Sequence, residues 1–277
     1  MGAVVRIVAD TAAVATIGFA IVPALDTGRR RDELALASAG PLIVTSAVWL
    51  VAEALRLATS AAEAAAVPLP RLSAWTAAEF ALHTGAGRAG LLSAAAAATV
   101  CGLAALAVGR SPSARLATAG AAGVGFAARA MAGHLSENTW GALAIAVHAI
   151  AAAIWCGGLV ALAVTIRHRG QWARVLPRFS AISLVCVAVV LATGIVGALL
   201  AAGPPTVWYE TTYGRLLLAK VVTLLALVVL GWRNRTVWVP AARSHRVSAG
   251  MSQRKSVAEL TLMALALTLA AVLAVTG

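Results

Sequence analysis

The chain has 277 residues, of which 61% are hydrophobic and only 12% are charged, and its mean hydropathy is +0.90. Soluble domains carry about 25% charged residues, so this chain has too little polar surface to fold in water. Its net charge of +12 would indicate nucleic-acid binding in a soluble protein. Here the basic residues stand in short clusters between apolar runs, so we expect no nucleic acid as a partner. Composition therefore predicts an integral membrane protein whose surroundings are the lipid bilayer.

A membrane-spanning helix needs about 20 apolar residues. Eight stretches of the chain meet this requirement: 4–25, 34–58, 89–109, 114–133, 140–166, 179–201, 214–238 and 256–276. The first is too long for the apolar part of a signal peptide, so we expect it to be retained. The chain is therefore expected to be all-α, a polytopic membrane helix bundle of about eight transmembrane helices that forms a single domain over residues 1–277.

Basic residues are distributed unevenly between the predicted spans. The connections after the first, third, fifth and seventh spans hold most of the loop arginines and lysines, whereas the intervening connections hold few, namely Arg71, Arg88 and Arg215. Because cytoplasmic loops carry the excess of Lys and Arg, the basic connections are expected in the cytoplasm. This orientation places both termini on the extracytoplasmic side.

The segment 60–88 is too short and polar to cross the membrane, and we expect it to be extracytoplasmic. It contains a short amphipathic helix, for which Ser73 is the predicted N-cap. Glu79 and His83 stand four residues apart and therefore share a helix face. Such a pair can bind a cation, or it can be an ordinary solvated pair.

Two of the five histidines flank a break in the apolar sequence. His134 ends the fourth predicted span at the outer interface, and His148 lies about two and a half turns inside the fifth. An imidazole at membrane depth needs a partner, either as a metal or haem ligand or through a hydrogen bond to another helix. Met131 precedes His134 by three residues, and its thioether suits cuprous ion. The two histidines either share one ion or pass it between them.

Other polar and sulfur-containing residues within the spans have structural explanations. Cys101, Cys156 and Cys186 form no C-x-x-C pair and are expected to be small buried residues, and Gly157 and Gly158 indicate close helix packing.

Acidic residues within the spans are expected to form ion pairs with basic residues. The predicted pairs are Asp10 with Arg6, Glu53 with Arg56, and Glu259 with Lys220 or Arg254.

The segment from Gly133-His134 through His148 to Trp155-Cys156-Gly157-Gly158-Leu159 resembles the core signature of the copper-resistance protein D (CopD/PcoD) family of bacterial inner-membrane proteins. Further motifs in the same order extend the resemblance over roughly 130–277: Arg178-Phe179-Ser180, Thr193-Gly194, Tyr213-Gly214-Arg215 with Lys220, Asn234-Arg235 and Glu259-Leu260. Residues 1–130 agree with the family only in general layout.

The resemblance implies a protein of the bacterial inner membrane that handles copper ions, by import or by transfer from the periplasmic side. The histidines of the family's motif correspond to His134 and His148, which are therefore candidate copper ligands. His83, Glu79 and Met131 are further candidate ligands on chemical grounds alone. It also implies a separate periplasmic CopC-like copper chaperone as partner, and no enzymatic reaction. The alternatives are a haem or electron-transfer protein with histidine axial ligands, and a non-transporting assembly factor for a copper oxidase.

Overall fold

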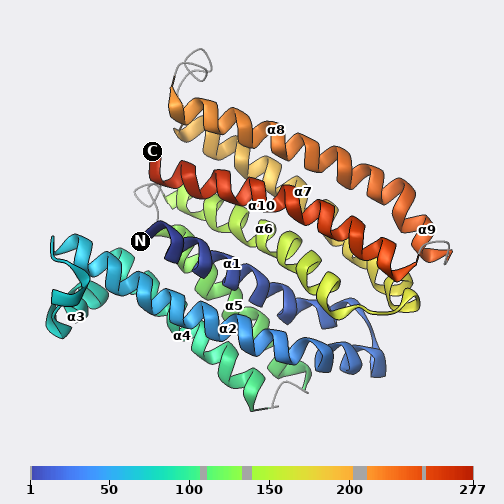
Figure 1. The fold of residues 1–277 in the computed structure, drawn as a ribbon, viewed down its shortest axis with the longest axis horizontal. Coiled ribbons are helices and arrows are strands. Elements are labelled where there is room, and N and C mark those ends of the chain that lie inside the picture. Colours follow the sequence, from blue (N-terminus) through green and yellow to red (C-terminus); the bar gives the residue numbers. More distant parts are fainter. Residues whose placement is uncertain (1, 107–110, 133–138, 202–210, 245–247, 277) are drawn as a thin grey trace.

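The computed structural model describes residues 2–106, 111–132, 139–201, 211–244 and 248–276, and in these ranges every regular element is a helix (Figure 1). The elements are α1 Gly2–Ile21, η1 Val22–Leu25, α2 Gly28–Ala64, η2 Leu69–Arg71, α3 Ala74–His83, α4 Gly85–Ala105, α5 Pro112–Met131, α6 Thr139–Thr165, α7 Arg169–Ala201, α8 Thr212–Arg233, η5 Asn234–Trp238, α9 Val239–Arg243 and α10 Ala249–Thr276.

Six helical stretches among the described residues are long and apolar enough to cross a membrane: Val4–Leu25, Gly28–Ala64, Gly85–Ala105, Thr139–Thr165, Arg169–Gly197 and Gly214–Ala242. The other two predicted spans, 114–133 and 256–276, fall largely within α5 and α10. The predicted all-α membrane bundle is therefore confirmed, and the chain is a multi-pass membrane protein. The number of eight spans, the side of the termini and the single domain stay predictions.

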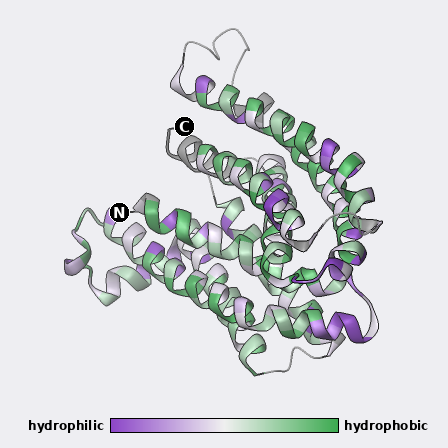
Figure 2. Ribbon diagram, turned by 45° about the vertical axis from the view of Figure 1, so that its right-hand side comes forward, coloured by the Kyte–Doolittle hydropathy of each residue, from purple (hydrophilic) through white to green (hydrophobic). Residues whose placement is uncertain are grey.

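The long helices run side by side, with α1 and α6 in the middle of the bundle (Figure 1). α1 packs against α2, α5 and α6, and α6 also packs against α7 and α10. The short helix α3 lies at one end of the bundle and α9 at the other. Hydrophobic residues cover most of the long helices, and hydrophilic residues mark several helix ends (Figure 2), which is the distribution that a bilayer requires.

The crossing of α1 and α6 explains the glycines of the Trp-x-Gly-Gly sequence. A methyl group at Gly157 would overlap the backbone oxygen of Val14, and one at Gly18 would overlap the backbone of Gly157. A methyl group at Gly158 would come within 2.7 Å of the Phe179 ring on α7. Small residues thus allow these backbones to approach closely, and the packing role predicted for Gly157 and Gly158 is confirmed.

Several helices extend beyond the apolar stretches that predicted them. α2 begins at Gly28, before the predicted span 34–58, and α7 begins at Arg169, ten residues before the predicted span 179–201. Each contains an internal proline, Pro41 or Pro177. Hydropathy detects the apolar part of a helix, whereas the helix itself continues into the polar interface until a cap or turn ends it.

A buried ion network joins the N-terminal helices. Glu53 of α2 is 1% exposed, and its carboxylate lies 3.3 Å from Arg129 Nε of α5 and 3.9 Å from Arg56 Nη1. The predicted pair of Glu53 with Arg56 is therefore confirmed, and Arg129 completes it. The ion pair predicted between Asp10 and Arg6 is wrong, because Asp10 Oδ1 lies 3.0 Å from Arg56 Nη1 instead. Packing of α1 on α2 brings this longer-range partner closer than the neighbour along the helix.

Candidate functional site

His148 lies on α6, nine residues after the helix begins at Thr139, and faces α7. A rise of about 1.5 Å per residue places it roughly 14 Å below the start of the helix. Its Nδ1 atom lies 3.0 Å from Oγ1 of Thr193 on α7, and the ring is half-buried. The depth predicted for His148 agrees with this position.

The contact with Thr193 bears on which ring nitrogen of His148 is available to a metal. Thr193 Oγ1 lies 2.6 Å from the backbone oxygen of Val189, and a threonine hydroxyl has a single proton. When that proton goes to Val189, the hydroxyl oxygen accepts from His148 Nδ1. The lone pair that can bind a metal is then on Nε2, in the arrangement usual for histidine ligands held by an outer partner.

Two further residues of the C-terminal half surround this ring. Gly194 stands beside it, where a methyl group would lie 3.7 Å from Cε1 of His148. Lys220 of α8 is half-buried and acts electrostatically on the imidazole.

Glu79 and His83 lie together on α3, as predicted. The helix is capped by Ser73, whose hydroxyl accepts a hydrogen bond from the amide of Thr76 at 3.0 Å, which confirms the predicted N-cap. His83 Nε2 lies 3.8 Å from Glu79 Oε2, and both side chains are exposed. The pair is open to any cation in the surrounding water, but the described residues add no third ligand to it.

Met131 is the last residue of α5 and is 41% exposed. Two residues earlier, Arg129 donates a hydrogen bond to the backbone oxygen of Ala86 at 2.9 Å. This bond holds the end of α5 beside the start of α4, three residues after His83. Met131 and the Glu79–His83 pair therefore lie at the same end of the bundle.

His134 lies outside the described residues, as does the rest of the segment 133–138. Within the described ranges no group of three or more His, Cys, Asp and Glu side chains could hold a metal ion. The structure therefore brings together Glu79 with His83, places Met131 at the same end, and holds His148 separately between α6 and α7. Among the described residues these side chains are therefore separate potential ligands rather than one preformed metal site.

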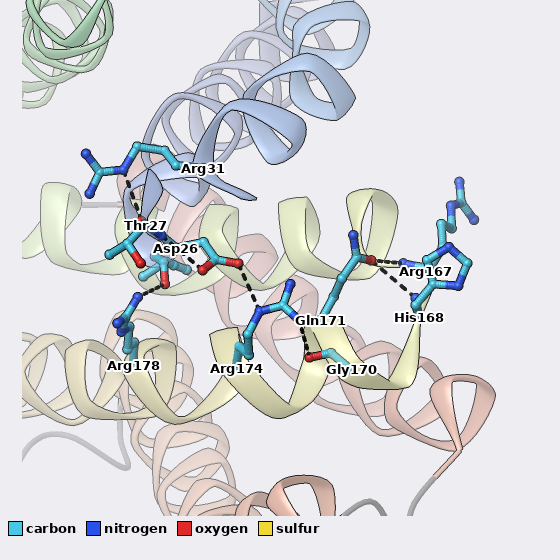
Figure 3. Close-up of polar contacts among 10 residues, drawn as sticks. Asp26, Thr27, Arg31, Arg167, His168, Gly170, Gln171, Arg174 and Arg178 are labelled. Carbon is cyan, nitrogen blue, oxygen red and sulfur yellow. Dashed lines mark hydrogen bonds and ion pairs between the residues drawn. The ribbon is translucent and has the colours of Figure 1, made fainter. Parts of the chain in front are cut away.

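A second polar cluster joins the α1–α2 connection to α7 at the opposite end of the bundle (Figure 3). Asp26 is 5% exposed, and its carboxylate lies 3.4 Å from Arg174 Nε. Arg178 donates to the backbone oxygen of Leu25 at 2.9 Å, and Arg31 donates to the backbone oxygen of Asp26 at 3.0 Å. These contacts hold the connection between α1 and α2 against α7. The composition of the sequence did not predict them.

Near this end, Glu259 of α10 is 6% exposed and faces α8. Its Oε2 accepts a hydrogen bond from Asn234 Nδ2 at 2.8 Å, and the Trp155 side chain also hydrogen-bonds the carboxylate. None of the ion pairs among the described residues involves Glu259. The predicted pairing with Lys220 or Arg254 is therefore wrong. Arg254, five residues away, points from another face of α10, and Lys220 lies near His148 instead.

Asn234 begins η5, a five-residue π-helix between α8 and α9. Such π-bulges frequently occur at functional sites. Beside it a cavity of about 230 Å³ extends between α7 and α8, with Glu259 at its inner wall. Its polar lining consists of Ser180, Ser183, Asn234, Arg235, Trp155 and Glu259, and the rest is apolar.

Residues from three of the sequence motifs meet at this cavity. Arg178-Phe179-Ser180, Asn234-Arg235 and Glu259 each contribute to the same end of the bundle, and five of these six residues line the cavity. Their separation along the chain concealed the site, because only the packing of α7, α8 and α10 brings them together.

Comparison with known proteins also points to the C-terminal half of the chain, where most of the cavity lies. Residues 173–273 match the family model for copper resistance protein D. The C-terminal part of this chain is therefore similar to the copper resistance protein D family. The matched region contains Thr193, Lys220 and most residues that line the cavity, but Trp155 and Leu159 of the lining precede it. It begins after α6, so His134 and His148 also lie outside it.

Part of this chain is also similar to a curated inner-membrane protein. The chain is 42% identical over 104 residues to the inner membrane protein YebZ of Escherichia coli strain K12, and the aligned region covers 35% of each chain. The chain thus matches about a third of the length of this relative. No solved structure matches the chain.

Proposed function

We propose that this protein handles copper in the bacterial inner membrane and moves copper ions inward from the periplasmic side. The observation that carries the proposal is the geometry of His148, whose Nδ1 lies 3.0 Å from Thr193 Oγ1 while Nε2 makes no contact with that hydroxyl. The match of residues 173–273 to the copper resistance protein D model supports copper as the cargo. Imidazole nitrogen and thioether sulfur are ligands that copper accepts.

The proposed route begins at the end of the bundle that holds Glu79, His83 and Met131. Their exposed side chains offer a carboxylate, an imidazole and a thioether to an arriving ion. His134 belongs to the same proposed entry. His148 lies roughly 14 Å deeper along α6 and receives the ion next. A separate periplasmic copper chaperone of the CopC type is proposed as the donor, and the proposal involves no enzymatic reaction.

A haem protein is the less well supported alternative. A pair of axial histidines must come from different helices at similar depth. Of the other histidines in the described ranges, His83 is on α3 and His168 precedes α7, at opposite ends of the bundle (Figure 1). Neither lies opposite His148.

Copper accumulation in cells that express the protein tests the proposal. We expect His148→Ala to reduce copper accumulation while protein abundance in the membrane is unchanged. His168→Ala is the matched control, because His168 is exposed and lies outside the proposed route. Equal accumulation in the wild type, the variant and cells without the protein would contradict transport. A strong absorption band of haem in the purified protein would favour the alternative.

A further inference from the structure

The cavity between α7 and α8 contains two opposite charges that do not contact each other. Glu259 and Arg235 both line it, yet they form none of the ion pairs among the described residues. Glu259 is 6% exposed and has only neutral hydrogen-bond donors, Asn234 and Trp155. A buried carboxylate without a cation is costly. The cavity is therefore shaped for a positive group at Glu259.

The other polar groups of the cavity leave hydrogen-bonding capacity for a ligand. Arg235 is exposed and donates through Nη1 to the backbone oxygen and hydroxyl of Ser180 at 3.1 and 3.2 Å. A guanidinium has five N–H donors, so donors remain for an anionic oxygen. Ser183 Oγ is buried without a hydrogen-bond partner among the described residues, and Ser183 also lines the cavity. Buried polar atoms of this kind normally have a partner.

The polarity of the cavity changes along the helices. Ser180, Asn234 and Arg235 lie toward the end of the bundle where Arg174 contacts Asp26. The part of the cavity nearer the middle of α7 and α8 is lined by Leu184, Val187, Leu227 and Val228. Two lining residues, Leu184 and Trp232, are 56% and 69% exposed on the outer surfaces of these helices. The cavity therefore opens sideways toward the lipid, with its polar part at the level of one membrane interface.

We propose that this cavity binds phosphatidylethanolamine, a zwitterionic phospholipid, with its ammonium group at Glu259, its phosphate at Arg235 and an acyl chain along α7 and α8. A zwitterion neutralises both unpaired charges at once, which neither an anionic lipid nor an apolar helix from a second copy can do. The three N–H donors of the primary ammonium group also suit the Glu259 carboxylate and the free Ser183 hydroxyl. A volume of about 230 Å³ accommodates a head group rather than isolated waters. This inference does not depend on copper transport.

Native mass spectrometry of the delipidated, detergent-purified full chain tests the proposal. The protein is titrated with phosphatidylethanolamine, phosphatidylcholine and phosphatidylglycerol that carry identical acyl chains. We expect phosphatidylethanolamine to bind roughly tenfold more tightly than phosphatidylglycerol, since one additional charge-assisted contact is formed. Phosphatidylcholine, whose ammonium has no N–H donor, should fall between them.

Two variants separate the contributions of the two charges. Glu259→Gln should reduce phosphatidylethanolamine affinity roughly tenfold and remove the preference over phosphatidylglycerol. Arg235→Gln should weaken the binding of both lipids roughly tenfold and leave the preference in place, because both lipids carry the phosphate. Arg233→Gln is the matched control, because Arg233 is exposed on the same turn but does not line the cavity. Because Arg235 is exposed, we expect the Arg235→Gln variant to retain the fold. Its elution profile on size-exclusion chromatography checks this. Equal binding of all three lipids, unchanged affinity in both variants, or a lipid-free dimer would each overturn the proposal.

Discussion

Thr193 holds the imidazole of His148 across the α6–α7 interface, with 3.0 Å between its Oγ1 and the ring Nδ1. When the threonine proton goes to the backbone oxygen of Val189, the hydroxyl accepts from the ring. The contact holds the orientation of His148, and this direction of the bond leaves Nε2 as the nitrogen for a metal. The histidine itself lies outside the matched family region, whereas the residue that positions it lies inside.

Thr193→Val should therefore weaken copper binding at His148 without removing it. The isosteric valine cannot accept the Nδ1 proton, and loss of such outer partners typically lowers metal affinity by 10- to 100-fold. Copper(I) affinity of the purified protein, measured by competition with a chromophoric chelator, checks this. Thr193→Ser retains a hydroxyl and should keep an affinity close to that of the wild type. Equal affinities of the valine variant and the wild type would contradict the positioning role.

Gly157→Ala should destabilise the contact between α1 and α6. The added methyl group would overlap the backbone oxygen of Val14, and a backbone atom cannot move aside as a side chain can. Overpacking of this kind costs about 1–3 kcal/mol. Thermal unfolding in detergent should therefore occur at a lower temperature. Gly120→Ala is the matched control, because nothing surrounds that position on α5, and an equal effect of both substitutions would refute the explanation.

Arg129→Gln should lower the free energy of unfolding by about 3 kcal/mol. The substitution leaves the Glu53 carboxylate, which is 1% exposed, without its nearest cation, and breaking a buried pair from one side is strongly destabilising. The double variant Glu53→Gln with Arg129→Gln should recover most of the loss, because the unpaired charge is then absent. Chemical denaturation of the two variants measures this difference. A double variant less stable than Arg129→Gln would show that the pair has another role.

The orientation of the bundle can be tested by cysteine labelling. In a background without Cys101, Cys156 and Cys186, Arg71→Cys in η2 should react with a membrane-impermeant maleimide on intact spheroplasts. Arg30→Cys at the start of α2 should react only after the membrane is opened. Both positions are exposed, so burial does not confuse the result. The reverse pattern would place the segment 60–88 and the proposed entry in the cytoplasm.

The sequence was sufficient for features that depend on local composition and spacing. Apolar stretches longer than about 18 residues predicted the long helices, and Ser73 predicted the start of α3 because a cap acts on amides only a few residues away. The pairing of Glu79 with His83 followed from helical periodicity alone.

Features that depend on packing between distant helices could not be predicted in the same way. Glu53 meets Arg129 only because α2 and α5 lie side by side, and His148 meets Thr193 only because α6 packs on α7. The cavity at Glu259 likewise requires α7, α8 and α10 together. In each case the partner lies on another helix, so spacing along one helix cannot identify it.

Copper transfer as proposed requires Nε2 of His148 to be a copper ligand. The most direct measurement is the copper(I) stoichiometry and affinity of the purified full chain, compared between the wild type, His148→Ala and the control His168→Ala. We predict that His148→Ala loses one bound ion, or lowers its affinity by at least roughly tenfold, while His168→Ala binds as the wild type does. Identical copper binding by all three proteins would contradict the claim.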